Sequence, residues 1–210
     1  MGKVIAVAGF CLALTICVAP VHAQVDPDPN GIGIYFDEGA NVFCTRADLG
    51  SEIAAYLCLT RITSEAGISK WEATVEVFPR DAVLAWSMRG QAVNASDVPE
   101  FVVELAEPLP WQSSLVVLEV TVSVLVEYPL AFRVHPVQNP SVTDTPFPLP
   151  AYAAGDDPAD YRTLGYSWGW DPTTGTPNWC AVVNPVGDCT DPPTENADHS
   201  WGEIKALYRQ

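Results

Sequence analysis

One pattern in the sequence is typical of a catalytic nucleophile, the pentapeptide Gly165-Tyr166-Ser167-Trp168-Gly169. In α/β-hydrolases a G-x-S-x-G motif holds the serine on a sharp turn between a strand and a helix. His199 follows in the chain, and one of three aspartates could complete a triad in the order these enzymes use, Asp188, Asp191 or Asp198. Residues 170–175, however, are typical of a turn. We therefore interpret Ser167 as a turn residue, keep a serine hydrolase only as an alternative, and expect no enzyme.

The histidines and acidic residues form no recognised metal-binding pattern. Only His135 and His199 follow residue 23, and they lack the spacing of a zinc enzyme. Acidic residues gather in 156–160 and 188–198, where oxygen-rich loops could hold calcium, but the EF-hand pattern is absent. We interpret these clusters as solvated loops, leave a structural metal ion open, and expect no cofactor.

Three tryptophans in the C-terminal part could form a sugar-binding surface, Trp168, Trp170 and Trp179. Exposed aromatic rings beside acidic side chains are suited to such a surface. Trp168 and Trp170 also fit an i, i+2 pair on one face of a strand, and large aromatic residues usually pack in cores. Core packing is the preferred interpretation, and a carbohydrate-binding module remains the alternative.

The first 23 residues have the features of a cleavable signal peptide. Lys3 provides the positive start, residues 4–18 are almost entirely apolar, and small residues precede a cleavage site before Gln24. Cleavage removes one of the 10 basic residues and none of the 26 acidic ones, so the charge becomes 9 − 26 = −17. Such a surface repels nucleic acid and anionic lipid. We expect a secreted or periplasmic protein with no membrane insertion after cleavage and an unidentified protein or glycan partner.

Four cysteines remain after cleavage, Cys44, Cys58, Cys180 and Cys189. An even number in an oxidising compartment favours two disulfides, for which three connectivities exist. Each neighbouring pair brackets a short loop, so we predict Cys44 with Cys58 and Cys180 with Cys189. A zinc site is disfavoured because no C-x-x-C pair occurs.

Apolar residues follow the two-residue period of β-strands through much of the chain. Between 114 and 128, every second residue from Val116 to Val126 is apolar, opposite a mostly polar face. Shorter runs alternate in the same way, at 32–36, 53–59, 71–77, 101–105 and 130–134. This predicts an all-β antiparallel sandwich of immunoglobulin or fibronectin type with roughly seven to nine strands.

The expected organisation is a signal peptide at 1–23, an N-terminal tail at 24–30 and a sandwich domain at 31–210. From about Pro136 the chain is rich in proline, glycine and aspartate, which indicates a loop-rich C-terminal part. Ser200 and Glu203 match a capping box, so one short C-terminal helix is compatible with the sequence.

Both ends of the chain resemble a group of uncharacterised secreted bacterial proteins. The resemblance is carried by residues 31–37, which read GIGIYFD and are followed by Cys44, and by residues 201–209, which read WGEIKALYR. It implies an immunoglobulin-like plan and no particular activity. We therefore expect a secreted, non-enzymatic protein of structural, adhesive or ligand-binding type.

Overall fold

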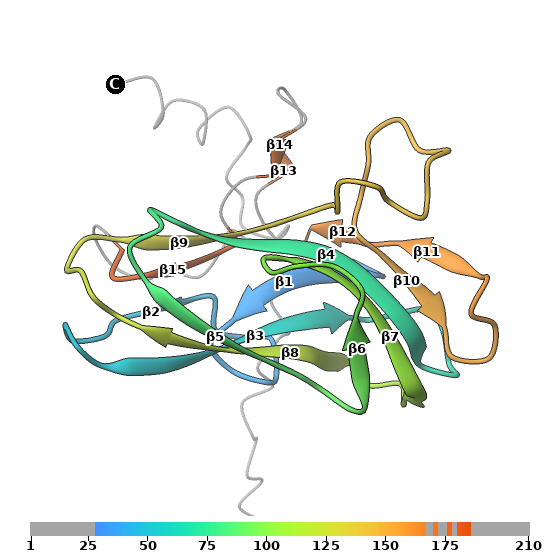
Figure 1. Cartoon of the computed structure of the whole chain (residues 1–210), viewed down its shortest axis with the longest axis horizontal. Helices are drawn as coiled ribbons and strands as arrows, with labels where there is room; N and C mark the ends of the chain where they lie inside the picture. Colours follow the sequence, from blue (N-terminus) through green and yellow to red (C-terminus); the bar gives the residue numbers. More distant parts are fainter. Residues whose placement is uncertain (1–27, 167–169, 172–175, 178–179, 186–210) are drawn as a thin grey trace, which may run out of the picture.

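The computed structural model describes residues 28–166, 170–171, 176–177 and 180–185. Within these residues every regular element is a strand, and no helix suited to crossing a membrane is found there. Most strands form two sheets that stack face to face (Figure 1). The predicted all-β sandwich is therefore confirmed. The predicted short C-terminal helix lies outside the described residues.

The first sheet has five strands: β1 (Gly31–Tyr35), β3 (Glu52–Thr60), β5 (Val83–Met88), β8 (Ser114–Ser123) and β12 (Gly165–Tyr166). Their order across the sheet is β12-β1-β3-β8-β5. β12 runs parallel to β1, and the other neighbours are antiparallel. The sheet therefore ends in a two-residue strand on one side and in the six-residue β5 on the other.

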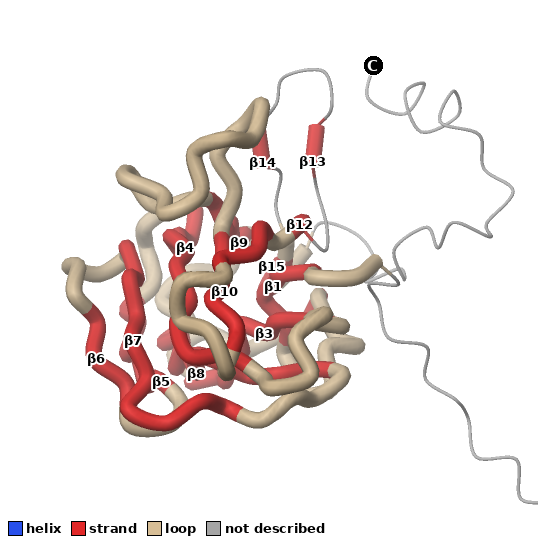
Figure 2. Tube along the Cα trace, turned by 90° about the vertical axis from the view of Figure 1, so that its right-hand side faces the viewer, coloured by secondary structure: helices blue, strands red, loops and turns tan. Residues whose placement is uncertain are grey.

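The second sheet has eight strands: β2 (Cys44–Thr45), β4 (Ile68–Phe78), β6 (Ala92–Asn94), β7 (Glu100–Leu109), β9 (Leu130–His135), β10 (Ala151–Ala154), β11 (Tyr161–Thr163) and β15 (Ala181–Val183). The main path is β11-β10-β4-β9-β15-β2; β7 also pairs with β4, and β6 with β7. β6 and β7 lie at one side of the molecule, away from β12 and β15 (Figure 2). β13 (Trp170–Asp171) and β14 (Thr176–Pro177) form a separate antiparallel ribbon.

The core lies between the two sheets, and β8 shows how its pattern departs from strict alternation. Leu118, Val120 and Val122 are fully buried, as predicted. Val116 is only partly buried, whereas Val117 is fully buried. The register with β3 shifts between Leu118 and Val116, which is a β-bulge that reverses the faces of the residues before it. The prediction of one continuous apolar face is therefore wrong at Val116.

The outer face of the second sheet is partly covered by the loop that follows β9. The Glu72 carboxylate, on β4, accepts hydrogen bonds of 2.7 Å from both the backbone N–H and the hydroxyl of Ser141. Glu72 is only 3% exposed. The Gln138 N–H donates to Glu100 on β7, and this bond is the main cause of a lowered Glu100 pKa. The loop therefore binds this face through two carboxylates.

The predicted pairing of the cysteines is wrong. Cys58 and Cys180 are buried free thiols, so neither the Cys44–Cys58 nor the Cys180–Cys189 disulfide forms. Cys58 packs beside Tyr35 and Ala40 on the outer side of the first sheet, whereas Cys180 belongs to the core between the sheets. Cys44 is disulfide-bonded. Its partner lies outside the described residues, as does Cys189.

Candidate binding groove at the open edge of the sandwich

Most residues singled out from the sequence lie outside the described part of the chain. Of the hydrolase candidates, Ser167 and His199 are not described, and neither are the three aspartates. Of the tryptophans, Trp168 and Trp179 are not described, and Trp170 is placed only as a residue of β13. Gly165 and Tyr166, which begin the G-x-S-x-G motif, form the edge strand β12 beside β1.

The described acidic residues and histidine serve ordinary structural contacts. His135 Nε2 lies 3.3 Å from Glu76 Oε2, so the imidazole of this histidine faces a carboxylate. In the 156–160 cluster, Asp160 pairs with Arg162 at 2.6 Å, and Asp157 accepts the Ala159 N–H. No group of three potential metal ligands occurs among the described residues.

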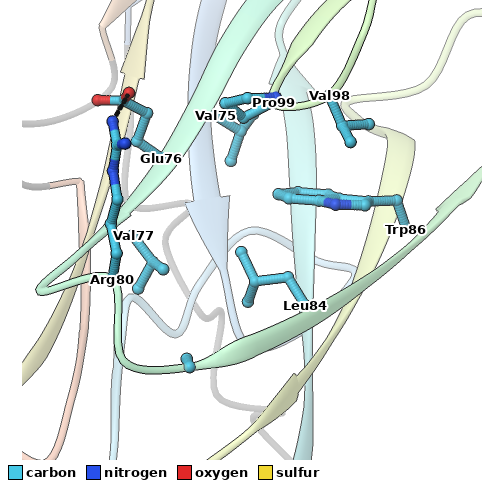
Figure 3. A pocket seen from close by; sticks show the side chains of 9 residues that line it. Val75, Glu76, Val77, Arg80, Leu84, Trp86, Val98 and Pro99 are labelled. Atoms are coloured by element: carbon cyan, nitrogen blue, oxygen red, sulfur yellow. Dashed lines mark hydrogen bonds and ion pairs between the residues drawn. The ribbon is translucent and has the colours of Figure 1, made fainter.

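An apolar groove opens between β4 of one sheet and β5 of the other (Figure 3). Its volume is about 280 Å³. The apolar side chains that line it are those of Val75, Val77, Ala82, Leu84, Trp86, Val98 and Pro99, with Glu76 and Arg80 at the rim. Figure 3 shows the Trp86 ring between Val98 and Leu84, and the Arg80–Glu76 pair at the left. Sequence reasoning did not identify this site.

The groove exists because β4 extends beyond the end of its pairing with β7. β7 pairs with β4 only as far as Thr74, and the last contact is the Val75 N–H to the Pro99 carbonyl, at 3.0 Å. Proline has no N–H, so it cannot extend the ladder by donating. β9 continues along the opposite edge of β4 to Phe78. Beyond Pro99 the inner face around Val77 is therefore left beside an opening.

The other wall is β5, the last strand of the first sheet. The Arg89 N–H donates to the Val117 carbonyl, and β5 pairs residue by residue with β8. Because alternate residues of an antiparallel strand bond to opposite sides, the backbone groups of Leu84, Trp86 and Met88 point away from β8. Within the described chain no backbone or side-chain group hydrogen-bonds to them.

Trp86 forms one wall of the groove and packs against the aromatic core. Its ring meets that of Phe101 edge to face, with centroids 5.2 Å apart. Phe101 in turn stacks on Trp71 at 5.7 Å, and both of these rings are buried in the core. Aromatic pairs in these geometries add to the stability given by burial alone. The groove therefore has a tryptophan wall supported by core aromatic rings, and tryptophan is enriched at binding hot spots.

The charges around the groove are predominantly negative. Arg80 is the basic residue of the rim, and its guanidinium lies 3.0 Å from Glu76. Asp81 and Asp97 are exposed and adjoin lining residues in sequence. Tyr128 donates a hydrogen bond to Asp81, and this bond is the main cause of a raised Tyr128 pKa. The rim therefore favours a ligand that is apolar where it enters and basic at its flanks.

A second, more polar hollow surrounds the end of β15. Asn184 accepts a hydrogen bond from the Ala47 N–H at 2.9 Å and donates one to the Ala47 carbonyl at 3.0 Å. These two hydrogen bonds hold Asn184 against the loop between β2 and β3. The described chain stops at residue 185, directly after Asn184, and we assign no site to this hollow.

Comparisons with known proteins find similarity of fold alone. No protein-family model and no curated protein matches the sequence. Among solved structures, the sixth cohesin of scaffoldin B from Acetivibrio cellulolyticus, solved in complex with a mutant Cel5 dockerin, has a TM-score of 0.47 and 11% identity over 75% of this chain and 99% of that chain. A type II cohesin domain from the cellulosome of the same organism has a TM-score of 0.47 and 14% identity over 75% and 96%.

Proposed function

We propose that this chain is an exported, non-enzymatic binding module whose groove between β4 and β5 takes apolar side chains of a protein partner. The observation that carries the proposal is the Trp86 wall, packed on Phe101 and facing an open, apolar hollow between the sheets. Export is supported by the signal-peptide features of residues 1–23.

The size and lining of the groove favour side chains over a small-molecule ligand. Pockets for small ligands usually measure roughly 300–1,000 Å³ and contain a few polar groups that are placed to bind the ligand. The groove is at the lower limit at about 280 Å³, and its charged lining side chains, Glu76 and Arg80, bind each other. Burial of one aliphatic side chain there would contribute about 1.5–3 kcal/mol.

Selection of random peptides of about twelve residues on the mature chain tests this proposal. Two exposed valines provide a matched pair of variants: Val98 is 54% exposed and lines the groove, whereas Val93 is 69% exposed on β6 and does not. Selected peptides should carry aliphatic residues. Val98→Asp should weaken their binding at least about tenfold, and Val93→Asp should leave it unchanged.

Thermal unfolding of both variants shows whether they remain folded. Binding that is equal in the Val98→Asp and unchanged proteins would exclude the groove as the binding site. Selected peptides without aliphatic residues would equally contradict the proposal, because nothing in the lining prefers a polar side chain.

A further inference from the structure

β5 differs from every other strand that ends a sheet in the described part of the chain. The other terminal strands have two or three residues: β2, β6, β11, β12, β13 and β14. β5 has six, Val-Leu-Ala-Trp-Ser-Met, with no proline and no charged residue. Proteins usually protect sheet edges by short strands, charges or proline, because an unpaired edge binds other strands. β5 has none of these protections.

Resting on the proposed function, we propose that β5 binds an extended segment of a basic partner protein by antiparallel strand addition. The backbone groups of Leu84, Trp86 and Met88 provide three N–H donors and three C=O acceptors along the free edge. An added strand lies about 4.8 Å from β5, which places it over the opening between the sheets. The same partner segment then forms main-chain hydrogen bonds with β5 and places side chains in the groove.

The alternation of β5 sets the sequence that the partner must have. Leu84 and Trp86 face the groove, while Val83, Ala85 and Ser87 are exposed on the outer face. Side chains of directly opposite residues lie on the same face of an antiparallel pair. The partner residues opposite Leu84 and Trp86 therefore point into the groove. The segment has two aliphatic residues separated by one residue of any type.

Charge selects a basic partner over a second copy of this chain. The chain has a formal net charge of −16, and Asp81 and Asp97 lie near the groove. Lysine or arginine on either side of the aliphatic residues is attracted to this field, which also speeds association. A second copy would bring an equal negative charge to the same edge.

The probe is the acetylated and amidated peptide KTVTITK, with two matched controls. One control is N-methylated at the valine and isoleucine amides that face β5, which keeps the side chains and removes main-chain hydrogen bonds. The other, ETVTITE, reverses the flanking charge. Binding to the full mature chain is measured by calorimetry, and backbone amide exchange is followed by NMR spectroscopy. Both controls should bind at least about tenfold more weakly than KTVTITK.

The exchange pattern identifies the edge. On peptide binding, the amide protons of Leu84, Trp86 and Met88 should become slow to exchange, whereas those of Val83, Ala85 and Ser87 are already bonded to β8. Equal affinity of the N-methylated peptide would overturn strand addition and leave the groove as a side-chain site. Binding of KTVTITK that the uncharged substitution Val98→Asn does not weaken would instead contradict the proposed function itself.

The other occupants of the edge have their own signatures. Protection of the Trp86 amide without peptide, in a chain that sediments as a dimer, would assign the edge to a second copy and overturn the proposal. The same protection in a monomer would assign the edge to another segment of this chain, and it would equally overturn it.

Discussion

Raising the pH above about 9 should destabilise the fold through its two buried thiols. Burial raises the pKa of the Cys58 thiol from 9.0 to about 12, and it raises that of Cys180 to about 12 as well. Between pH 9 and about pH 12, the two thiols lose their protons in the unfolded chain and keep them in the folded chain. The stabilisation is therefore complete below the unfolded pKa and is lost as the pH rises toward the folded pKa. Each thiol lowers the free energy of unfolding by about 1.4 kcal/mol per pH unit, and the two together by about 2.7 kcal/mol per unit.

Urea unfolding of the mature chain at a series of alkaline pH values measures this slope. The comparison is with Cys58→Ala, Cys180→Ala and the double variant, which keep every tyrosine of the chain; Cys58 is the smallest of the causes that shift the Tyr56 pKa. Each single substitution should remove about 1.4 kcal/mol per pH unit from the slope. The cavity left by alanine changes the stability but not its dependence on pH. An alkaline slope that is the same in the double variant and the unchanged protein would refute the burial of the thiols as the cause.

Two further predictions concern single positions of the fold. At Gly67, with φ +78°, an added Cβ would lie 1.9 Å from the Leu109 carbonyl oxygen, whereas Gly50, with φ +82°, has no atom within 4 Å. Thermal unfolding should therefore show Gly67→Ala to be destabilised by about 3 kcal/mol or more and Gly50→Ala by about 1 kcal/mol; equal losses would contradict the contact with Leu109. Peptide mapping of the unreduced mature chain should find Cys44 cross-linked, with Cys189 as the expected partner because Cys58 and Cys180 are free; a cross-link to either buried thiol would be inconsistent with this structure.

The architecture was predictable because burial of one sheet face imposes a two-residue period on the sequence. The two-residue period is clearest in β8, where apolar residues alternate over a long run. The bulge opposite Leu57 and Cys58 was not predictable. A bulge depends on how two strands fit together, and a pattern read along one strand contains no information about its neighbour. The alternation itself therefore could not show which face of the sheet the residues before the bulge occupy.

The cysteine pairing failed for a related reason. Cys44 and Cys58 are close in sequence, but they lie in different sheets, on β2 and β3. β2 pairs in parallel with β15, with Cys44 opposite Val182. Pairing is decided by which strands become neighbours, and short sequence separation is a weak guide to that in a sandwich with crossing connections.

The groove could not be predicted from the sequence, because the apolar residues that line it are of the same types as those that fill the core. Val75 and Val77 belong to the alternating run of β4, and nothing in that run shows that pairing with β7 stops beside Val75. The available signals were Pro99, which cannot donate to a ladder, and the absence of charge in β5. Both signals indicate a binding site only when it is known that β5 is the edge strand of its sheet.

The negative charge and the unprotected edge are consistent with one another under the proposed mode of binding. A long, uncharged edge strand normally promotes pairing between copies of a protein. Here the protection does not lie on the strand, where a lysine or proline would also block a partner. It comes from a net charge of −16, which makes two copies repel each other and attracts a basic segment to the same edge. Screening acts over about 8 Å at physiological salt, so discrimination depends mainly on charges close to the edge, such as Asp81 and Asp97.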